Sequence, residues 1–108
     1  DMAANPYLMA AGIGAAGLDG LARNIPPPPP CDRNMYDPSD PLVAAAIRDA
    51  PPLPRSLAGA LDLLDASPAL RSGLGDAFVD SYLKLRRAHV REYEGQLTPW
   101  ELREYLDA

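Results

Sequence analysis

The chain opens with a long run of apolar and small residues that has the start signals of a helix. Asn5 is a favourable N-cap, and Pro6 has a preset φ at a position where no backbone N–H is needed. Gly20 can adopt the left-handed turn that ends a helix, so the pattern predicts a helix from Pro6 to Asp19. No charge occurs from Pro6 to Leu18, and such a helix is normally enclosed by protein. The remaining chain is too small and too polar to enclose it.

A second strong pattern lies in the second half of the chain. From Asp76 onward, five residues recur at intervals of three and four: Phe78, Tyr82, Leu85, His89 and Tyr93. Charged residues lie on the opposite side of the same helical projection: Asp80, Lys84, Arg87 and Arg91. This spacing predicts a long amphipathic helix over roughly Asp76–Glu94, with the first set on its apolar side.

Capping residues mark shorter helices elsewhere. Three segments follow such signals: Leu57–Asp65 after Ser56, Ala69–Leu74 after Ser67-Pro68, and Pro99–Leu106 after Thr98. The last start is the strongest, because Thr98 and Glu101 have the spacing of a capping box. Asp40 and Pro41 precede one further candidate, a short helix that continues to Arg48. Gly73 and Gly75 interrupt the chain before the long helix.

Composition supports helices rather than strands. The 108 residues include thirteen prolines but few aromatic or β-branched residues, which favours short helices separated by rigid turns. The length is that of one domain, which buries roughly two thirds of its unfolded surface. We therefore predict a single all-α unit over residues 1–108, an irregular array of about five helices. The prolines of residues 25–30 form a stiff extended connector within it.

Charge and cysteine content restrict the partners and the compartment. A net charge of −5 provides no basic surface for phosphate backbones, so no nucleic acid is expected. The apolar run is shorter than the ~20 residues that span a bilayer, so no membrane partner is expected. The single cysteine, Cys31, cannot form an internal disulfide, which fits the reducing cytoplasm. Because the chain starts with Asp1 and lacks a cationic leader, we interpret it as a fragment.

The residues offer no catalytic constellation. Activating a carboxylate with ATP requires divalent metals held by clustered carboxylates or histidines, and cations for the phosphates. The acidic residues are dispersed, and Asp62 and Asp65 are expected on a solvated face. His89, the only histidine, has apolar neighbours at helical spacing, which favours a core or interface histidine over a ligand. Without a phosphate loop or an activated nucleophile, we predict no catalytic, cofactor-binding or metal-binding residue in this chain.

Two weaker motifs have alternative explanations. Arg23-x-x-Pro26-x-x-Pro29 matches the pattern that SH3-type grooves bind, but five consecutive prolines satisfy it trivially. Arg23 also suits the C-terminus of a helix, where a cation favours the macrodipole. Trp100 could anchor an interface or pack the last helix onto the long one. A free-standing helical interaction module, presenting the prolines or an apolar helix, is one function class for this chain.

A second class follows from a resemblance that extends along nearly the whole chain. Six segments are similar, in order and in spacing, to the glutamine synthetase family: Asp1-x-x-Ala-Asn-Pro-Tyr-Leu8, Ala15-Ala-Gly-Leu-Asp-Gly20, Cys31-Asp-Arg-Asn-Met-Tyr36, Leu53-Pro-Arg-Ser-Leu57, Gly75-Asp-Ala-Phe-Val79 and Thr98-Pro-Trp-Glu101. The fourth and sixth look more like a divergent bacterial subgroup, which includes synthetases of γ-glutamyl amides and N-methylglutamate.

The resemblance implies both a fold and an activity for a longer parent. This chain would be the C-terminal, mainly helical part of a larger α+β catalytic domain. The parent would use ATP and Mg²⁺ or Mn²⁺ to join the glutamate γ-carboxylate to ammonia or an amine, through a γ-glutamyl phosphate. In the family the metal, ATP and glutamate residues lie upstream of the position matched by Asp1, so none transfers here. The implied partners are the rest of the parent chain and the other subunits of a homo-oligomer.

One functional position does transfer from the family. Asn34-Met-Tyr36-Asp37 resembles the loop whose tyrosine is adenylylated in some bacterial glutamine synthetases, and a loop tyrosine is accessible to a modifying enzyme. The sequence departs from the family directly afterwards, at Pro38-Ser39-Asp40. Tyr36 is therefore a candidate adenylylation site, with an unmodified turn tyrosine as the alternative.

Overall fold

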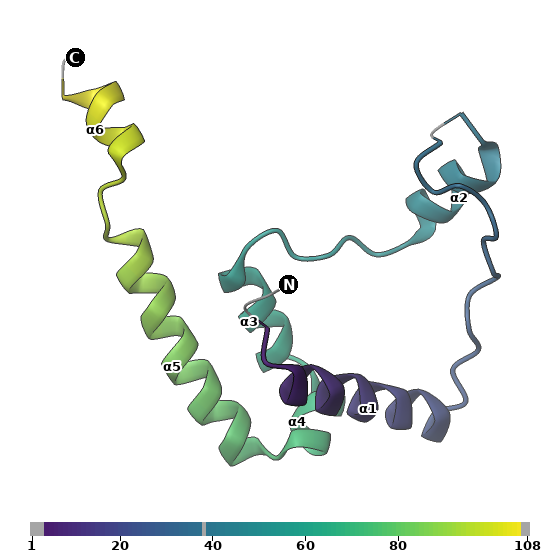
Figure 1. Ribbon diagram of the computed structural model, residues 1–108. Helices are drawn as coiled ribbons and strands as arrows, with labels where there is room; N and C mark the ends of the chain where they lie inside the picture. Colours follow the sequence, from purple (N-terminus) through teal and green to yellow (C-terminus); the bar gives the residue numbers. More distant parts are fainter. Residues whose placement is uncertain (1–3, 38, 107–108) are drawn as a thin grey trace.

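The computed structural model describes residues 4–37 and 39–106, which form helices without any strand. Figure 1 shows six helices in this part of the chain: α1 (Pro6–Ala22), α2 (Pro41–Asp49), α3 (Leu57–Asp65), α4 (Pro68–Leu74), α5 (Asp76–Glu94) and α6 (Pro99–Tyr105). The predicted all-α class is confirmed, and the short candidate helix after Asp40 accounts for the sixth. None of these helices is both long enough and apolar enough to cross a membrane.

The helices form an open arrangement rather than a compact one (Figure 1). The radius of gyration is 18.8 Å, whereas a compact domain of this length has about 13 Å. Helices α3, α4 and α5 contact one another and α1 contacts α4, while α2 and α6 pack on no other helix among the described residues. The chain therefore buries less apolar surface than an independent domain of its length.

Side chains cap the helix starts where the sequence predicts them. The Asn5 side chain accepts hydrogen bonds from the backbone N–H groups of Tyr7 and Leu8, at 3.0 and 3.2 Å. At α6, Thr98 and Glu101 form the predicted capping box, with hydrogen bonds of 2.7 and 3.2 Å. Each such cap contributes about 1 kcal/mol to helix stability. The cap and the N–H groups that it binds are only two or three residues apart, so these starts can be recognised from local sequence.

The end of α1 lies later than the sequence predicts. The helix runs through Gly20 to Ala22, and Asn24 rather than glycine adopts the left-handed turn, with a φ of 51°. The Ile25 N–H donates to the Gly20 carbonyl at 2.9 Å, and the Asn24 N–H donates to the Leu21 carbonyl at 3.1 Å. This pair of bonds is a Schellman motif, which asparagine also tolerates.

The main core lies between α3 and α5. Leu61 of α3 and Val79 and Leu83 of α5 are buried, and partly buried apolar residues surround them: Leu64, Leu74, Tyr82 and Val90. Gly75 makes the turn from α4 into α5 with a φ of +88°, a conformation that side-chain-bearing residues rarely adopt. The predicted chain interruption there thus lets the chain turn directly from α4 into α5, and both helices contact α3.

The buried face of α5 differs from the predicted one. The expected apolar side is exposed at several positions, including 55% at Leu85 and 76% at Tyr93. Val79 and Leu83 are buried instead, one position further along the helix, which corresponds to a rotation of about 100°. The aliphatic side chains meet Leu61 closely, whereas the bulkier aromatic positions border an open groove or face solvent. The predicted helix bounds of α5 are confirmed.

Candidate functional site

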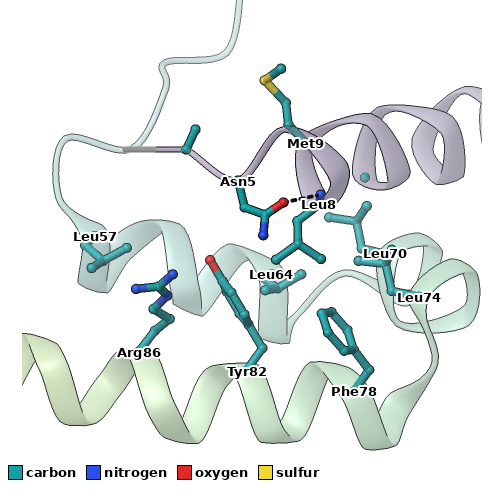
Figure 2. A pocket seen from close by; sticks show the side chains of 12 residues that line it. Asn5, Leu8, Met9, Leu57, Leu64, Leu70, Leu74, Phe78, Tyr82 and Arg86 are labelled. Carbon is teal, nitrogen blue, oxygen red and sulfur yellow. Dashed lines mark hydrogen bonds between the residues drawn. The ribbon is translucent and has the colours of Figure 1, made fainter. Parts of the chain in front are cut away.

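An apolar groove lies between α1 on one side and α3, α4 and α5 on the other (Figure 2). Its volume is about 490 Å³. Most of its surface comes from aliphatic and aromatic side chains: Leu8, Met9, Leu57, Leu64, Leu70, Leu74, Phe78 and Tyr82. The groove exists because α1 approaches α4 while leaving a gap to α3 and α5.

Three of the side chains that line this groove have polar groups: Asn5, Tyr82 and Arg86. Asn5 is already engaged as the cap of α1, and Arg86 lies over the Tyr82 ring at 5.3 Å from its centroid. The described residues contain no group of three or more His, Cys, Asp or Glu side chains that could hold a metal ion. The groove is therefore lined mainly by apolar side chains, which suits a packing surface.

A charged cluster connects α3, α4 and α5. Arg71 of α4 donates to Asp65 of α3 at 2.6 Å, and to Asp76 and Asp80 of α5 at 2.9 Å each. Its guanidinium also donates to the Asp65 backbone carbonyl at 2.8 Å. Arg87 of α5 binds Asp65 from the other side, at 3.0 Å. We call these five residues the Arg71 cluster. Its ion pairs join α3, α4 and α5 to one another.

The Arg71 cluster changes the acid–base behaviour of Asp65. Hydrogen bonds from Arg71 and then Arg87 hold the pKa of the Asp65 carboxyl below its ordinary value. Hydrogen bonds to Asp65, Asp76 and Asp80 raise the pKa of Arg71, so Arg71 and Asp65 both stay charged over the physiological range. A depressed carboxyl pKa stabilises the fold fully above the ordinary aspartate pKa of about 4, and this stabilisation is lost as the pH falls below it.

Replacing the central guanidinium should reveal this linkage. We expect Arg71→Met to lower the midpoint of thermal unfolding at neutral pH, because Asp65, Asp76 and Asp80 lose their shared cation. The decrease in stability between about pH 5 and pH 3 should also become shallower. The control is Arg48→Met, since Arg48 pairs with its exposed sequence neighbour Asp49 and so links no two helices. Equal thermal shifts for both variants, measured by circular dichroism, would show that the cluster stabilises nothing.

The structure separates the candidate residues that the sequence singled out. His89 is exposed, with Nδ1 at 3.5 Å from Nη1 of Arg86, so it is not a core histidine, and the alternative of an interface histidine stays a prediction. Asp62 is on a solvated face as predicted, at 73% side-chain exposure, whereas Asp65 is only 37% exposed within the Arg71 cluster. Local spacing could not reveal this cluster, because its partners are five to twenty-two positions apart.

Two other predicted roles have mixed outcomes. Arg23 lies at the C-terminus of α1 and pairs with Asp19 at 3.1 Å, which confirms its placement at a helix end. Trp100 is 54% exposed and meets Tyr105 edge-on within α6, and α6 packs on no other helix among the described residues. The expectation that α6 packs onto α5 is therefore wrong, and an interface role for Trp100 stays a prediction.

Tyr36 lies at the tip of a loop that local hydrogen bonds hold in shape. Its backbone N–H donates to the Asn34 side chain at 3.1 Å, and Asp37 accepts two bonds from Ser39, at 3.0 and 2.6 Å. These bonds hold the pKa of Asp37 below its ordinary value. The Tyr36 side chain is 94% exposed, so it is accessible to a macromolecule.

Comparison with known proteins assigns the chain to a family. Residues 1–105 match the family described as glutamine synthetase, catalytic domain. This chain belongs to the glutamine synthetase family. The match, over nearly every residue, confirms the resemblance to the C-terminal segment of that domain. The family assignment thus rests on the whole chain rather than on one motif.

Individual relatives of the glutamine synthetase family agree with the assignment. The chain is 37% identical over 107 residues to a glutamine synthetase of Rhizobium leguminosarum bv. phaseoli, covering 99% of this chain and 23% of the relative. It is 36% identical over 108 residues to a glutamate–methylamine ligase of Methyloversatilis universalis, covering 99% and 24%. A solved structure, apo GmaS without ligand, superposes with a TM-score of 0.82 at 42% identity, covering 100% and 24%. The chain thus spans about a quarter of the length of these relatives.

Proposed function

We propose that this chain is the helical, C-terminal part of an ATP-dependent ligase that joins the γ-carboxylate of glutamate to ammonia or a small amine. The observation that supports this most strongly is the superposition of the whole chain on a quarter of apo GmaS, at a TM-score of 0.82. The relatives include both glutamine synthetases and a glutamate–methylamine ligase, at similar identities. We therefore propose ammonia and small amines together as the class of acceptor.

In the proposed reaction, a γ-carboxylate oxygen attacks the γ-phosphorus of ATP, and ADP leaves. The nitrogen of ammonia or the amine then attacks the γ-carbonyl carbon, loses a proton, and displaces inorganic phosphate. The metal ions and cations that this transfer requires would be held by the parent outside these 108 residues.

The chain itself would contribute packing and subunit contacts in the cytoplasm. Helix α1 has no charge from Pro6 to Leu18 and no buried residue, and Tyr7 and Ile13 are 84% and 68% exposed. Apolar surface of this extent normally lies against protein. We assign its cover to the rest of the parent chain and to neighbouring subunits.

The reading frame upstream of Asp1 tests this proposal against a free-standing interaction module. The ligase requires upstream coding sequence that supplies clustered carboxylates and arginines for metal and phosphates. A start codon shortly before Asp1, with no such sequence, would instead support the module.

We further propose that Tyr36 is an adenylylation site of the parent, because its exposed ring lies in a preformed loop. The protein isolated from nitrogen-rich cells should then have the added mass of one AMP, and Tyr36→Phe should abolish it. Intact-mass spectrometry is the measurement, with Tyr93→Phe as the control because that ring is also 76% exposed. A parent of unmodified mass under these conditions would contradict the assignment.

A further inference from the structure

Helix α1 is attached to the rest of the molecule through α4. Among the described residues, α4 is the only helix whose backbone comes close to that of α1, and the groove separates α1 from α3 and α5. Figure 1 shows α1 crossing beside α4. The position of α1 therefore depends on this single contact between helices.

The contact is unusually close at one residue pair. A Cβ added at Gly73 of α4 would overlap the Cβ of Ala15 in α1 and come within 3.4 Å of its Cα. The glycines of α1 itself face open space. An added Cβ would have nothing within 4 Å at Gly12, Gly14, Gly17 or Gly20. At Gly73, therefore, the lack of a side chain is what allows the close approach of α1.

Helix α4 is a fixed support for this contact. Arg71, two residues before Gly73, binds Asp65 of α3 and both Asp76 and Asp80 of α5. A side chain at position 73 would therefore displace α1 rather than α4. Carbon atoms prefer separations of about 3.5–4.0 Å, so α1 would have to move away by about 1 Å or more.

We propose that Gly73 is a positioning residue, which lets α1 rest directly on α4 and so sets the placement of the apolar surface of α1. This inference rests on the proposed function, in which that surface supports the catalytic part of the parent ligase. Its role would be indirect, because Gly73 itself touches Ala15 and no reacting group.

Hydrogen exchange of the 108-residue chain tests the contact without any activity. Helix α1 contains four glycines and is marginal as a helix by itself, so docking protects its amides. We expect Gly73→Ala to speed α1 exchange by about tenfold and to leave α5 unchanged. The matched control is Gly17→Ala, which meets no neighbour and should slow α1 exchange by about twofold to fivefold. The opposite signs distinguish steric displacement from helix propensity.

A reciprocal substitution completes the test. In the Ala15→Gly background the overlapping Cβ is gone, so Gly73→Ala should no longer speed α1 exchange. In the parent, Gly73→Ala should lower turnover with glutamate and an amine by at least about tenfold, relative to Gly17→Ala. Adding Ala15→Gly should restore it. Ala15→Val provides a second route to the same displacement, with α4 unaltered.

The outcomes separate the two proposals. Slower α1 exchange in Gly73→Ala, or no rescue by Ala15→Gly, would overturn the positioning role. Normal turnover of a Gly73→Ala parent would overturn it as well. A wild-type parent that is inert towards glutamate and every amine would refute the proposed ligase, while the exchange data would still decide the contact.

Discussion

We expect the isolated 108-residue chain to release no phosphate from ATP in the presence of glutamate and amines, and the longer parent to release it. Phosphoryl transfer to a carboxylate needs metals and preorganised donors, and removing a single donor typically lowers rates by about 10²–10³. The described residues of this chain have no cluster that could hold a metal, and its central arginine is already bound by three carboxylates. The rate difference should therefore exceed about a thousandfold.

The assay uses glutamate with a panel of ammonia, methylamine and larger amines, and glutamate omitted as the control. Phosphate release by the chain alone would contradict the assignment of the chemistry to the rest of the parent. The acceptor that gives the fastest release by the parent would identify the amine.

The second large effect concerns the core between α3 and α5. Leu83 is 3% exposed in contact with Leu61 and Val79, so Leu83→Ala should lower the free energy of unfolding by about 2–5 kcal/mol. Leu85, two residues later on the same helix, is 55% exposed, and Leu85→Ala should change stability by no more than about 0.5 kcal/mol. Chemical denaturation of both variants measures the difference. If Leu85→Ala were as costly as Leu83→Ala, the observed face of α5 would be incorrect.

The helix starts could be predicted because their determinants are local. The Asn5, Ser56 and Thr98 caps each bond to an N–H within three residues, so the relevant chemistry lies in adjacent sequence. The same holds for the turn that presents Tyr36. The end of α1 could not be predicted from single residues, because Asn24 and Gly20 are both suitable for a left-handed turn. Only the hydrogen bonds from Asn24 and Ile25 to the preceding carbonyls distinguish the two positions.

Features that depend on distant partners could not be predicted. The spacing along α5 predicts a different apolar side, and only the position of Leu61 in α3 decides that Val79 and Leu83 are buried. The same spacing predicts Arg87 on the side opposite the apolar one, but Arg87 binds Asp62 and Asp65 across twenty-five and twenty-two positions. The contact of Gly73 with Ala15 likewise joins helices that are far apart in sequence.

The chain spans about a quarter of the length of its glutamine synthetase relatives. Its exposed apolar helix and open groove are the surfaces expected where such a part meets the remainder.

Calorimetric titration of ATP with Mn²⁺ into the parent and into the isolated chain tests the central claim most directly. The parent should bind the nucleotide with measurable heat, and the chain should give only the heat of dilution. Saturable binding of ATP and Mn²⁺ by the chain alone would contradict the account.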